Sequence, residues 1–186
     1  IMGHYYYYLV STLPLLKLFE PAPWSSEEFL TECVRELSEN DLNLLKATEL
    51  IPQNDITLPP ETMSFAWDNF ERQLRNRIVR QIAGTSDKGA AFERDSIGYY
   101  SDVELIVSEA WNQSNPLERE KVLDRWRWRF LDDQEGHESF GSLGFICMYK
   151  IKLQLIEKWD RRQLEAGQTN LTQVLEKCGT INEEEK

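Results

Sequence analysis

The sequence predicts an all-α fold, a multi-helix bundle of paired helices with two long helices in its core. Apolar residues recur every three or four positions over long segments, which is the period of an amphipathic helix. Residue patterns that cap helices precede several of these segments. Only the tyrosine-rich start has the composition of a β-strand, and a strand without a partner would leave its backbone groups unpaired.

The first fifty residues are expected to form short helices. The segment 5–10 (YYYYLV) should be part of a helix that ends before Pro14, because a proline disfavours helical backbone angles in the residue before it. After a proline-rich link, Ser25 and Glu28 have the spacing of a capping box. The next helix should turn one apolar face inward: Phe29, Leu30, Cys33, Val34 and Leu37. Another short helix is expected over residues 39–50, with Leu42, Leu45 and, at its end, Leu50 facing the core.

The first long helix is expected over residues 61–83, after a linker at 51–60 that holds three prolines. Its buried stripe should consist of Met63, Ala66, Trp67, Phe70, Leu74, Ile78 and Ile82. Gly84 is placed to end the helix, as glycine commonly does. Residues 84–100 are polar and contain glycine, so they are expected to be the most mobile connection.

Two further helices are expected between residues 101 and 135. Ser101 and Glu104 have the spacing of a second capping box. The helix after them should bury Val103, Ile106, Val107, Ala110 and Trp111. Asn115 is expected to cap the next helix, with Pro116 at its first position. That helix is apolar on two sides, with Val122, Trp126 and Phe130 on one side and Leu117, Trp128 and Leu131 on the other.

The second long helix is expected over residues 140–162. Its first half is apolar on nearly every side, so it should be the central helix: Phe140, Leu143, Phe145, Ile146, Cys147 and Met148. The small residues of the stretch 141–144 (GSLG) lie within this helix and should permit close helix packing. A last amphipathic helix is expected at 171–178. The chain should form one helical domain over 1–186, either as a single unit or as an N-terminal lobe of residues 1–50 packed on a main bundle of residues 61–178.

The charge balance disfavours nucleic acid as a partner, because 32 acidic residues outweigh 21 Lys and Arg and give a net charge of −11. Arginines nevertheless gather in two of the expected helices. Such faces are usually only solvated, but guanidinium groups also bind the carboxylates of acidic partners in a bidentate manner. The candidate protein interface consists of Arg72, Arg75, Arg80, Arg125, Arg127, Arg129 and Trp128.

No motif predicts a catalytic, cofactor or metal site, so the chain is not expected to be an enzyme. The two histidines are His4 and His137, and His137 lies beside Glu135 and Glu138 in a predicted loop. The alternative is that His137, Glu135 and Glu138 form an unrecognised catalytic or metal site, although a histidine in a loop is more often solvated.

The cysteines favour a reducing compartment. Cys33, Cys147 and Cys178 are widely separated, and Cys33 and Cys147 lie in apolar stripes, so inert buried thiols are expected. Neither a signal peptide nor a membrane-spanning segment is visible in the sequence. A cytoplasmic location without direct membrane insertion is therefore expected.

Two stretches resemble a known family. They are residues 3–14 (GHYYYYLVSTLP) and residues 149–159, with YKIKL followed by EKW. Both resemble a bacterial family that is typically encoded inside V-type (also called A-type) ATPase operons. Residues 25–50 are also loosely similar to the N-terminal part of the C-type socket protein of V-type ATPases, known as the d-type in eukaryotes.

The resemblance implies a function as well as a fold. The socket protein is all-helical and non-catalytic, sits on the rotor ring and receives the central shaft. The resemblance therefore implies an accessory or stalk-type component that binds shaft or rotor-ring components and associates with the membrane through the complex. A generic helical adaptor or regulator unrelated to the ATPase remains the alternative.

Overall fold

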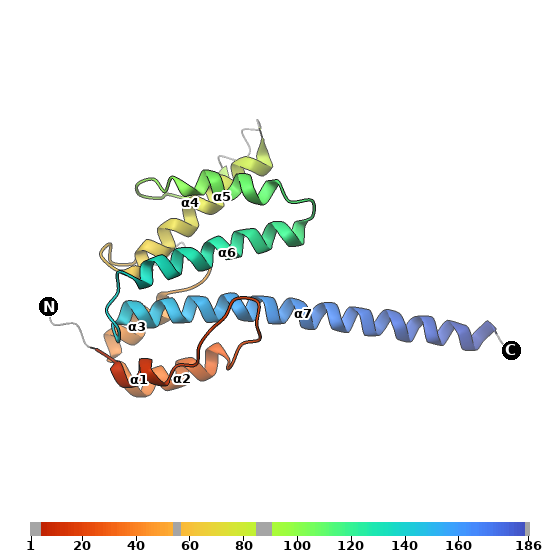
Figure 1. Cartoon of the computed structure of the whole chain (residues 1–186), viewed down its shortest axis with the longest axis horizontal. Helices are drawn as coiled ribbons and strands as arrows, with labels where there is room; N and C mark the ends of the chain where they lie inside the picture. Colours follow the sequence, from red (N-terminus) through yellow and green to blue (C-terminus); the bar gives the residue numbers. More distant parts are fainter. Residues whose placement is uncertain (1–4, 54–56, 85–90, 185–186) are drawn as a thin grey trace.

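The computed structural model describes the backbone of residues 5–53, 57–84 and 91–184, and the side chains of these segments up to residue 163. The described residues contain α-helices and no β-strand, which confirms the all-α prediction. In chain order the helices are α1 (Tyr7–Thr12), α2 (Ser26–Glu36), α3 (Glu39–Ala47), α4 (Met63–Ala83), α5 (Asp102–Trp111), α6 (Pro116–Glu135) and α7 (Leu143–Glu184) (Figure 1).

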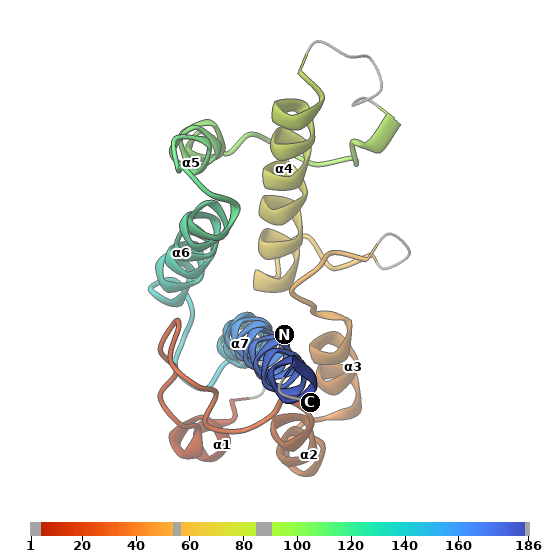
Figure 2. The same ribbon diagram turned by 90° about the vertical axis from the view of Figure 1, so that its right-hand side faces the viewer.

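The first part of α7 lies at the centre of the bundle. Helices α1, α2 and α3 lie on one side of it, and α6 with α4 and α5 lies on the other (Figures 1 and 2). Helices α2, α3, α4 and α6 all contact α7, and α5 packs on α4 and α6. The central position predicted for this helix is confirmed, because it is buried on every side through Ile146, Cys147, Met148, Ile151, Leu153, Leu155 and Ile156.

The bounds of α7 differ from those expected. It begins at Leu143, because Gly141 has a left-handed backbone (φ +84°) that the helix cannot include. It then continues to Glu184 beyond the bundle (Figure 1), so the expected separate helix at 171–178 is part of α7. Residues 143–184 contain no proline, and an isolated glycine costs a helix only about 1 kcal/mol.

Three of the expected helix ends are confirmed. Ser25 and Glu28 form the capping box, and the Asn115 side chain accepts from the backbone N–H of Glu118 with Pro116 in the first turn. Gly84 ends α4 with a positive φ of 59°. The residues that directly follow, 85–90, belong to the connection expected to be mobile and lie outside the described residues.

The second predicted capping box, at Ser101, is wrong. Ser101 already has helical backbone angles (φ −57°, ψ −32°), and its side chain makes no bond to the helix N-terminus. A capping residue needs an extended backbone to bring its hydroxyl over the first turn. Glu104, the expected second member of the box, instead pairs with Arg77 on α4 at 2.6 Å.

The predicted buried stripes agree with the structure except near their ends. In α2 the residues Phe29, Cys33 and Leu37 are buried, whereas Val34 is exposed. In α4 the stripe residues Met63, Trp67, Phe70 and Leu74 are buried and Ala66 is half-buried. Ile82 is 72% exposed because the end of α4 projects beyond its neighbours. Helix α3 ends at Ala47, before Leu50.

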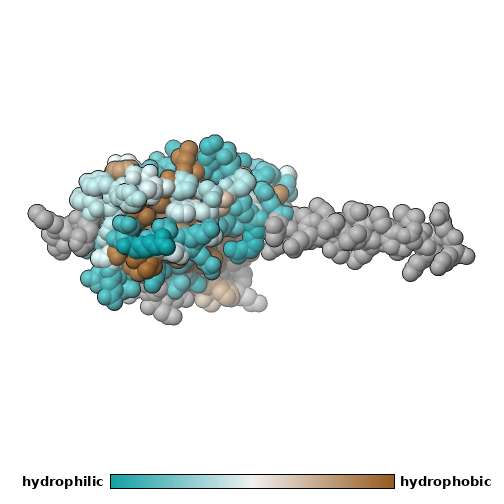
Figure 3. Space-filling model, turned by 90° about the horizontal axis from the view of Figure 1, so that it is seen from below, coloured by the Kyte–Doolittle hydropathy of each residue, from teal (hydrophilic) through white to brown (hydrophobic). Residues whose placement is uncertain are grey.

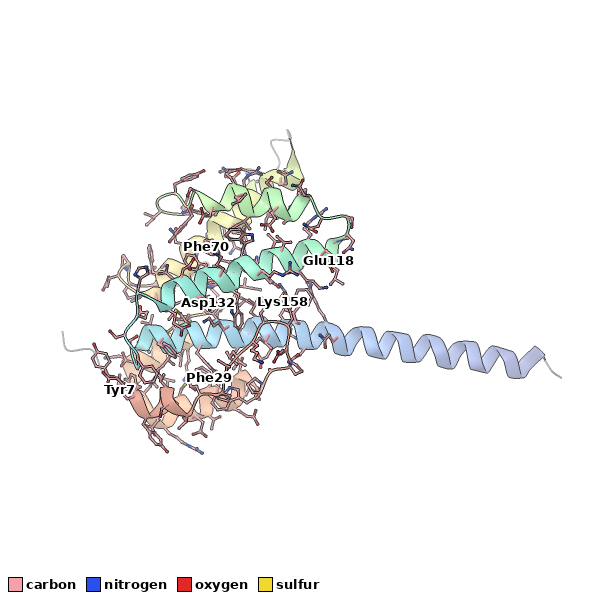
Figure 4. All side chains as sticks on the ribbon, viewed as in Figure 1. Tyr7, Phe29, Phe70, Glu118, Asp132 and Lys158 are labelled. Carbon is pink, nitrogen blue, oxygen red and sulfur yellow. The ribbon has the colours of Figure 1, made fainter. Side chains whose placement is uncertain are left out.

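Aromatic rings join α4 to α6 in the upper half of the bundle. Phe70 of α4, labelled in Figure 4, stacks on Phe130 of α6 with ring centroids 4.1 Å apart, and Tyr100 packs edge-on against both. Trp67, which is 1% exposed, contacts the same two phenylalanines. These rings continue into one hydrophobic cluster that also includes residues of α1, α2, α3 and α7.

None of the helices in the described part of the chain contains a stretch that is long and apolar enough to cross a membrane. Cys33 and Cys147 are buried free thiols, as expected, and burial raises the pKa of both. The side chain of Cys178 lies outside the described residues.

Candidate protein interface

Two of the α4 arginines expected at the interface are held by side chains of their own helix. Arg72 pairs with Asp68 at 2.5 Å and is largely buried. Arg75 pairs at 2.7 Å with Glu71, whose side chain is fully buried. Each acid lies one helical turn before its arginine, where side chains of one face meet. Arg72 and Arg75 therefore have much of their binding capacity taken up within the fold.

Arg80 is the accessible member of the α4 set. Its side chain is 60% exposed and donates two hydrogen bonds to Glu93. The hydrogen bond to Glu93 raises the pKa of Arg80, and the same bond lowers the pKa of Glu93. An exposed pair of this kind contributes only about 0–1 kcal/mol to stability, so a carboxylate of a partner could compete with Glu93.

The α6 arginines do not form one surface. Arg125 and Arg129 are exposed on one face, where their guanidinium groups lie over the rings of Phe19 and Trp126. Arg127 points the opposite way, is only 6% exposed and is paired inside the bundle, so it does not share a surface with the other two. Residues two apart on a helix are rotated by about 200°, which separates Arg127 from the other two.

Trp128 is half-buried and packs towards α7. The Nζ of Lys152 lies 5.4 Å from the centre of its ring, and Lys152 also pairs with Asp132 and Glu135, each at 2.7 Å. Trp128 therefore contributes to the contact between α6 and α7. The expected set divides into internal contacts and two separate exposed positions.

Arg127 is the centre of a buried ion network between α4, α6 and α7. It donates two hydrogen bonds of 2.9 Å to Glu71 and one of 2.7 Å to Asp124. Burial by itself lowers the pKa of Arg127, but attraction to Glu71 and Asp124 outweighs burial and raises it. Asp124 also accepts from the Nε1 of Trp159 at 2.8 Å and from Lys158 at 2.7 Å.

The network opens to the surface at Glu120. Lys158 of α7 faces α6 (Figure 4) and donates to Glu120 as well as to Asp124. Burial acts to raise the pKa of Glu120, but the hydrogen bond and charge of Lys158 outweigh it and lower the pKa. These groups neutralise one another, which makes the network a device for fixing three helices rather than a reactive site.

The histidine alternative receives no geometric support. His137 is exposed in the turn after α6, and its neighbours bond elsewhere: Glu135 accepts from Lys152 and Glu138 from the hydroxyl of Ser142. Among the residues whose side chains are described, no group of three or more His, Cys, Asp or Glu is placed to hold a metal ion. His4 lies outside the described residues.

An exposed aromatic patch lies where α1 meets the start of α7. Tyr5 stacks on Tyr7, and Tyr7 stacks on Phe140, with ring centroids 5.4 and 6.1 Å apart. Together with Leu15, which is 81% exposed, these residues form what we call the aromatic patch: Tyr5, Tyr7, Leu15 and Phe140. Tyr7 is labelled at this end of the bundle in Figure 4, and Figure 3 views the face formed by α1 and α2, where hydrophobic atoms interrupt the hydrophilic surface.

An apolar pocket of about 210 Å³ adjoins the aromatic patch. Leu15 and Phe140 form part of its wall, and Met148 and Tyr149 of α7 line it further in. Apolar pockets of this kind accept a side chain of a partner, and aromatic residues are common anchors at the centre of protein interfaces. This arrangement is the best candidate interface in the described part of the chain.

The two stretches that carry the family resemblance meet beside this pocket. The hydroxyl of Tyr149 donates to the carbonyl O of Pro14 at 3.0 Å and accepts from the Nε1 of Trp24 at 3.0 Å. The backbone N–H of Tyr6 donates to the carbonyl O of Gly141 at 2.7 Å. The tyrosine-rich start is thus fixed to the beginning of α7.

The aromatic patch was not among the residues predicted for the interface. A run of consecutive tyrosines in a helix must point to several sides, so part of it has to be exposed, and this signal was available in the sequence. The sequence pattern instead predicts Phe140 inside the central helix, because an apolar side chain there indicates burial. The structure leaves it 54% exposed before the helix begins.

Comparison of the chain with protein-family models, with curated protein sequences and with solved structures found no match.

Proposed function

We propose that this chain is a non-catalytic accessory or stalk-type component of a V-type ATPase and acts as a structural coupler that binds other components of the complex. One observation carries the proposal. The two stretches that resemble the operon-encoded family, 3–14 and 149–159, contact one another and contribute to the aromatic patch and its pocket. A shared surface is a physical reason for both stretches to carry the same resemblance.

The aromatic patch has the chemistry of a protein-binding surface. Tyrosine and phenylalanine rings bury a large apolar area at a small cost in side-chain entropy, and tyrosine keeps a hydroxyl for a hydrogen bond. The rings of Tyr5, Tyr7 and Phe140 support one another by stacking, so they are partly ordered before a partner arrives. The partner expected from the resemblance is a shaft or rotor-ring component.

The fold also suits a coupler that bears mechanical load. Helix α7 has 42 residues, a length of about 60 Å at 1.5 Å per residue, and it extends from the aromatic patch to a point beyond the bundle (Figure 1). The buried network around Arg127 fixes α4 and α6 to the central part of this helix. One rigid element therefore connects two distant regions of the molecule.

Affinity purification tests the proposal. The tagged chain is recovered from its native host in mild detergent, and co-purified proteins are quantified by mass spectrometry. We expect the catalytic, shaft or ring proteins of a V-type ATPase in a reproducible ratio. The double variant Tyr5→Ser/Tyr7→Ser should reduce their recovery at least about tenfold, because it removes two aromatic anchors.

A matched control is Tyr99→Ser, which removes a tyrosine that is 74% exposed but lies outside the aromatic patch. It should leave the recovery unchanged. Recovery of other proteins through the aromatic patch, without ATPase components, would support the generic adaptor instead. Equal recovery by Tyr5→Ser/Tyr7→Ser and by the unaltered chain, at equal melting temperature, would exclude the aromatic patch as the interface.

A further inference from the structure

A second surface, a groove between α4 and α6, differs in chemistry from the aromatic patch. The groove has a volume of about 790 Å³ and is lined by residues from the C-terminal half of α4 and the N-terminal half of α6. Its apolar walls include Ile82, Phe92 and Trp111, and the first two are 72% and 70% exposed. Apolar side chains of this size that face a groove are available to a ligand.

Arg119 contributes an unsatisfied donor to this groove. Its guanidinium group lies over the ring of Trp111 at 4.6 Å, and its Nε is buried without a hydrogen-bond partner among the described residues. No carboxylate in the described part of the chain pairs with it. The buried Nε is unfavourable but closed to solvent, so a ligand in the groove would bind the terminal N–H groups of Arg119, which form no ion pair among the described residues.

Arg94 is a second arginine of the groove without an acidic partner. Its guanidinium group donates to the backbone carbonyl of Pro52 and forms no ion pair within the described residues. Arg75 and Arg127, by contrast, are paired with the buried acids Glu71 and Asp124 and add little free charge.

The one acidic side chain that lines the groove in the described part of the chain is Glu120, and Lys158 already binds it. The groove is therefore electropositive, although the whole chain has a net charge of −11.

We propose that this groove binds a short acidic segment of a partner polypeptide that also carries a large apolar side chain. Arg119 and Arg94 receive carboxylates, and the apolar side chain lies against Ile82 and Phe92. A guanidinium group stacked on an aromatic ring is held with its N–H donors directed outward, which suits a bidentate pair with a carboxylate. The proposal rests on the proposed function only in that the chain acts by binding protein.

A nucleic acid fits the groove less well than an acidic peptide. A polyphosphate would have to approach a chain of net charge −11, which repels it. It would also leave the exposed side chains of Ile82 and Phe92 without an apolar partner.

Binding of synthetic peptides to the purified full-length chain tests this proposal. The probes are short fluorescent peptides in which one Phe, Leu or Trp is placed among Asp and Glu residues. Matched peptides carry Asn and Gln in place of the acids. In fluorescence anisotropy titrations, we expect acidic peptides to bind more tightly than their neutral counterparts, with an affinity that falls as salt is added.

Variants of single arginines then locate the binding site. Arg119→Gln should weaken binding of the best acidic peptide at least about tenfold, the loss expected for a charge-assisted pair. Arg119→Lys should recover only part of the affinity, because it restores the charge and not the planar fork. The control Arg129→Gln removes an exposed arginine of α6 that does not line the groove, and it should have no effect.

Three results would overturn the proposal. They are equal binding of acidic and neutral peptides, full affinity in Arg119→Gln, and a preference for single-stranded oligonucleotides over every peptide. Arg119→Gln removes the contact with Trp111 but no ion pair of the described structure, so its melting temperature should fall by only a few degrees. The variant Tyr5→Ser/Tyr7→Ser should bind the peptides normally, so failure at the groove and failure of the proposed function are distinguishable.

Discussion

Arg127 of α6 and Glu71 of α4 form a bidentate ion pair, with two N–H···O distances of 2.9 Å, although 56 residues separate them in the chain. Glu71 is fully buried and Arg127 is 6% exposed. The attraction between two buried charges offsets their desolvation only when their geometry is good and their remaining hydrogen-bonding groups have partners. Asp124 and Arg75 are such partners on the two sides of this pair.

Removing one partner of this pair should be more damaging than removing both. Arg127→Met removes the cation that lies between the buried carboxylates of Glu71 and Asp124, and we expect it to lower the unfolding free energy by about 3–5 kcal/mol. The double variant Glu71→Gln/Arg127→Met should recover part of this loss, because one stranded charge is also removed. Urea denaturation of the two single variants and the double variant measures the coupling.

The exposed pair of Arg77 and Glu104 is the matched control for this cycle. It also joins two helices, at 2.6 Å, but the Glu104 side chain is 53% exposed. Glu104→Gln should therefore cost less than about 1 kcal/mol. A coupling energy near zero for the Arg127–Glu71 pair would show that the buried network does not hold α4 against α6.

Lys150 is a buried cation that closes the C-terminal end of α3. Its Nζ donates to the carbonyl oxygens of Leu45 and Thr48 at 3.0 and 2.7 Å and to Glu49 at 2.9 Å. The last carbonyls of a helix have no partner within the helix, and a cation there also matches the helix dipole.

Lys150→Met keeps much of the side-chain volume but removes these hydrogen bonds. We expect a loss of about 2–4 kcal/mol in urea denaturation, because the carbonyls of Leu45 and Thr48 lose this buried donor. Lys46→Met, which alters an exposed lysine of α3, should be neutral within about 0.5 kcal/mol. Equal stability of Lys150→Met and the unaltered chain would mean that water satisfies these carbonyls.

The helices could be predicted from the sequence because their signals are local. The capping box at Ser25 and the proline after Asn115 specify helix starts through neighbouring residues. Ser101 has the same spacing to a glutamate as Ser25, yet it does not cap its helix. What differs is the backbone angle of the serine, and the spacing of residue types does not determine that angle.

The position of Arg127 shows the limit of reading charge along a chain. The helical period rotates Arg127 by about 200° from Arg125, so the sequence alone places these two arginines on different faces of the helix. The carboxylate that holds Arg127, Glu71, belongs to a helix far away in the sequence. Only the packing of α4 on α6 shows that this arginine is internal, so local charge counts overestimated the interface.

Side-chain amides of α4 hold the segment 94–100 against the helix. Asn76 donates to the carbonyl of Arg94 at 2.7 Å and accepts from its N–H at 2.9 Å. Asn69 makes the same two bonds with Ile97, at 2.6 and 2.7 Å. An amide that pairs with both backbone groups of one residue replaces the partner that a neighbouring strand would supply.

Asn69→Ala should therefore release this segment without unfolding the bundle. Hydrogen exchange followed by mass spectrometry should show faster exchange around Ile97, by at least about tenfold, with the exchange of α7 unchanged. Asn112→Ala, at an exposed asparagine after α5, is the control and should change neither. Unchanged exchange near Ile97 in Asn69→Ala would mean that other contacts hold the segment.

Alkaline pH should destabilise the fold through groups that are buried in the neutral form. Burial raises the pKa of the Cys33 thiol from 9.0 to about 12, and it raises the pKa of Tyr149 from 10.0 to about 12. Between these values the unfolded chain loses protons that the folded chain retains. The unfolding free energy should thus be unaffected below pH 9 and fall as pH rises towards 12, by up to about 1.4 kcal/mol per pH unit for each group.

Cys33→Ala tests the assignment of this alkaline effect. It removes one of the two buried thiols, so stability should fall less steeply between pH 9 and pH 12, while Cys147 still contributes from about pH 9 and Tyr149 from about pH 10. Urea denaturation at a series of pH values measures both curves. Identical curves for Cys33→Ala and the unaltered chain, apart from a constant offset, would contradict a role for the Cys33 thiol.

Gly141 and Gly98 provide a matched pair for testing how the aromatic patch is held. Both have a positive φ, of 84° and 72°, but a Cβ on Gly141 would lie 2.8 Å from the ring of Tyr7, whereas a Cβ on Gly98 would meet nothing within 4 Å.

Gly98→Ala should cost only the left-handed backbone term, about 1–2 kcal/mol, and leave partner recovery unchanged. Gly141→Ala should cost more and displace Tyr7 from its stack with Phe140. Partner recovery in the affinity purification should then fall, because a disordered ring loses more conformational entropy on binding. Equal effects of the two variants on stability and recovery would show that the close approach of Tyr7 to Gly141 is not what orders the aromatic patch.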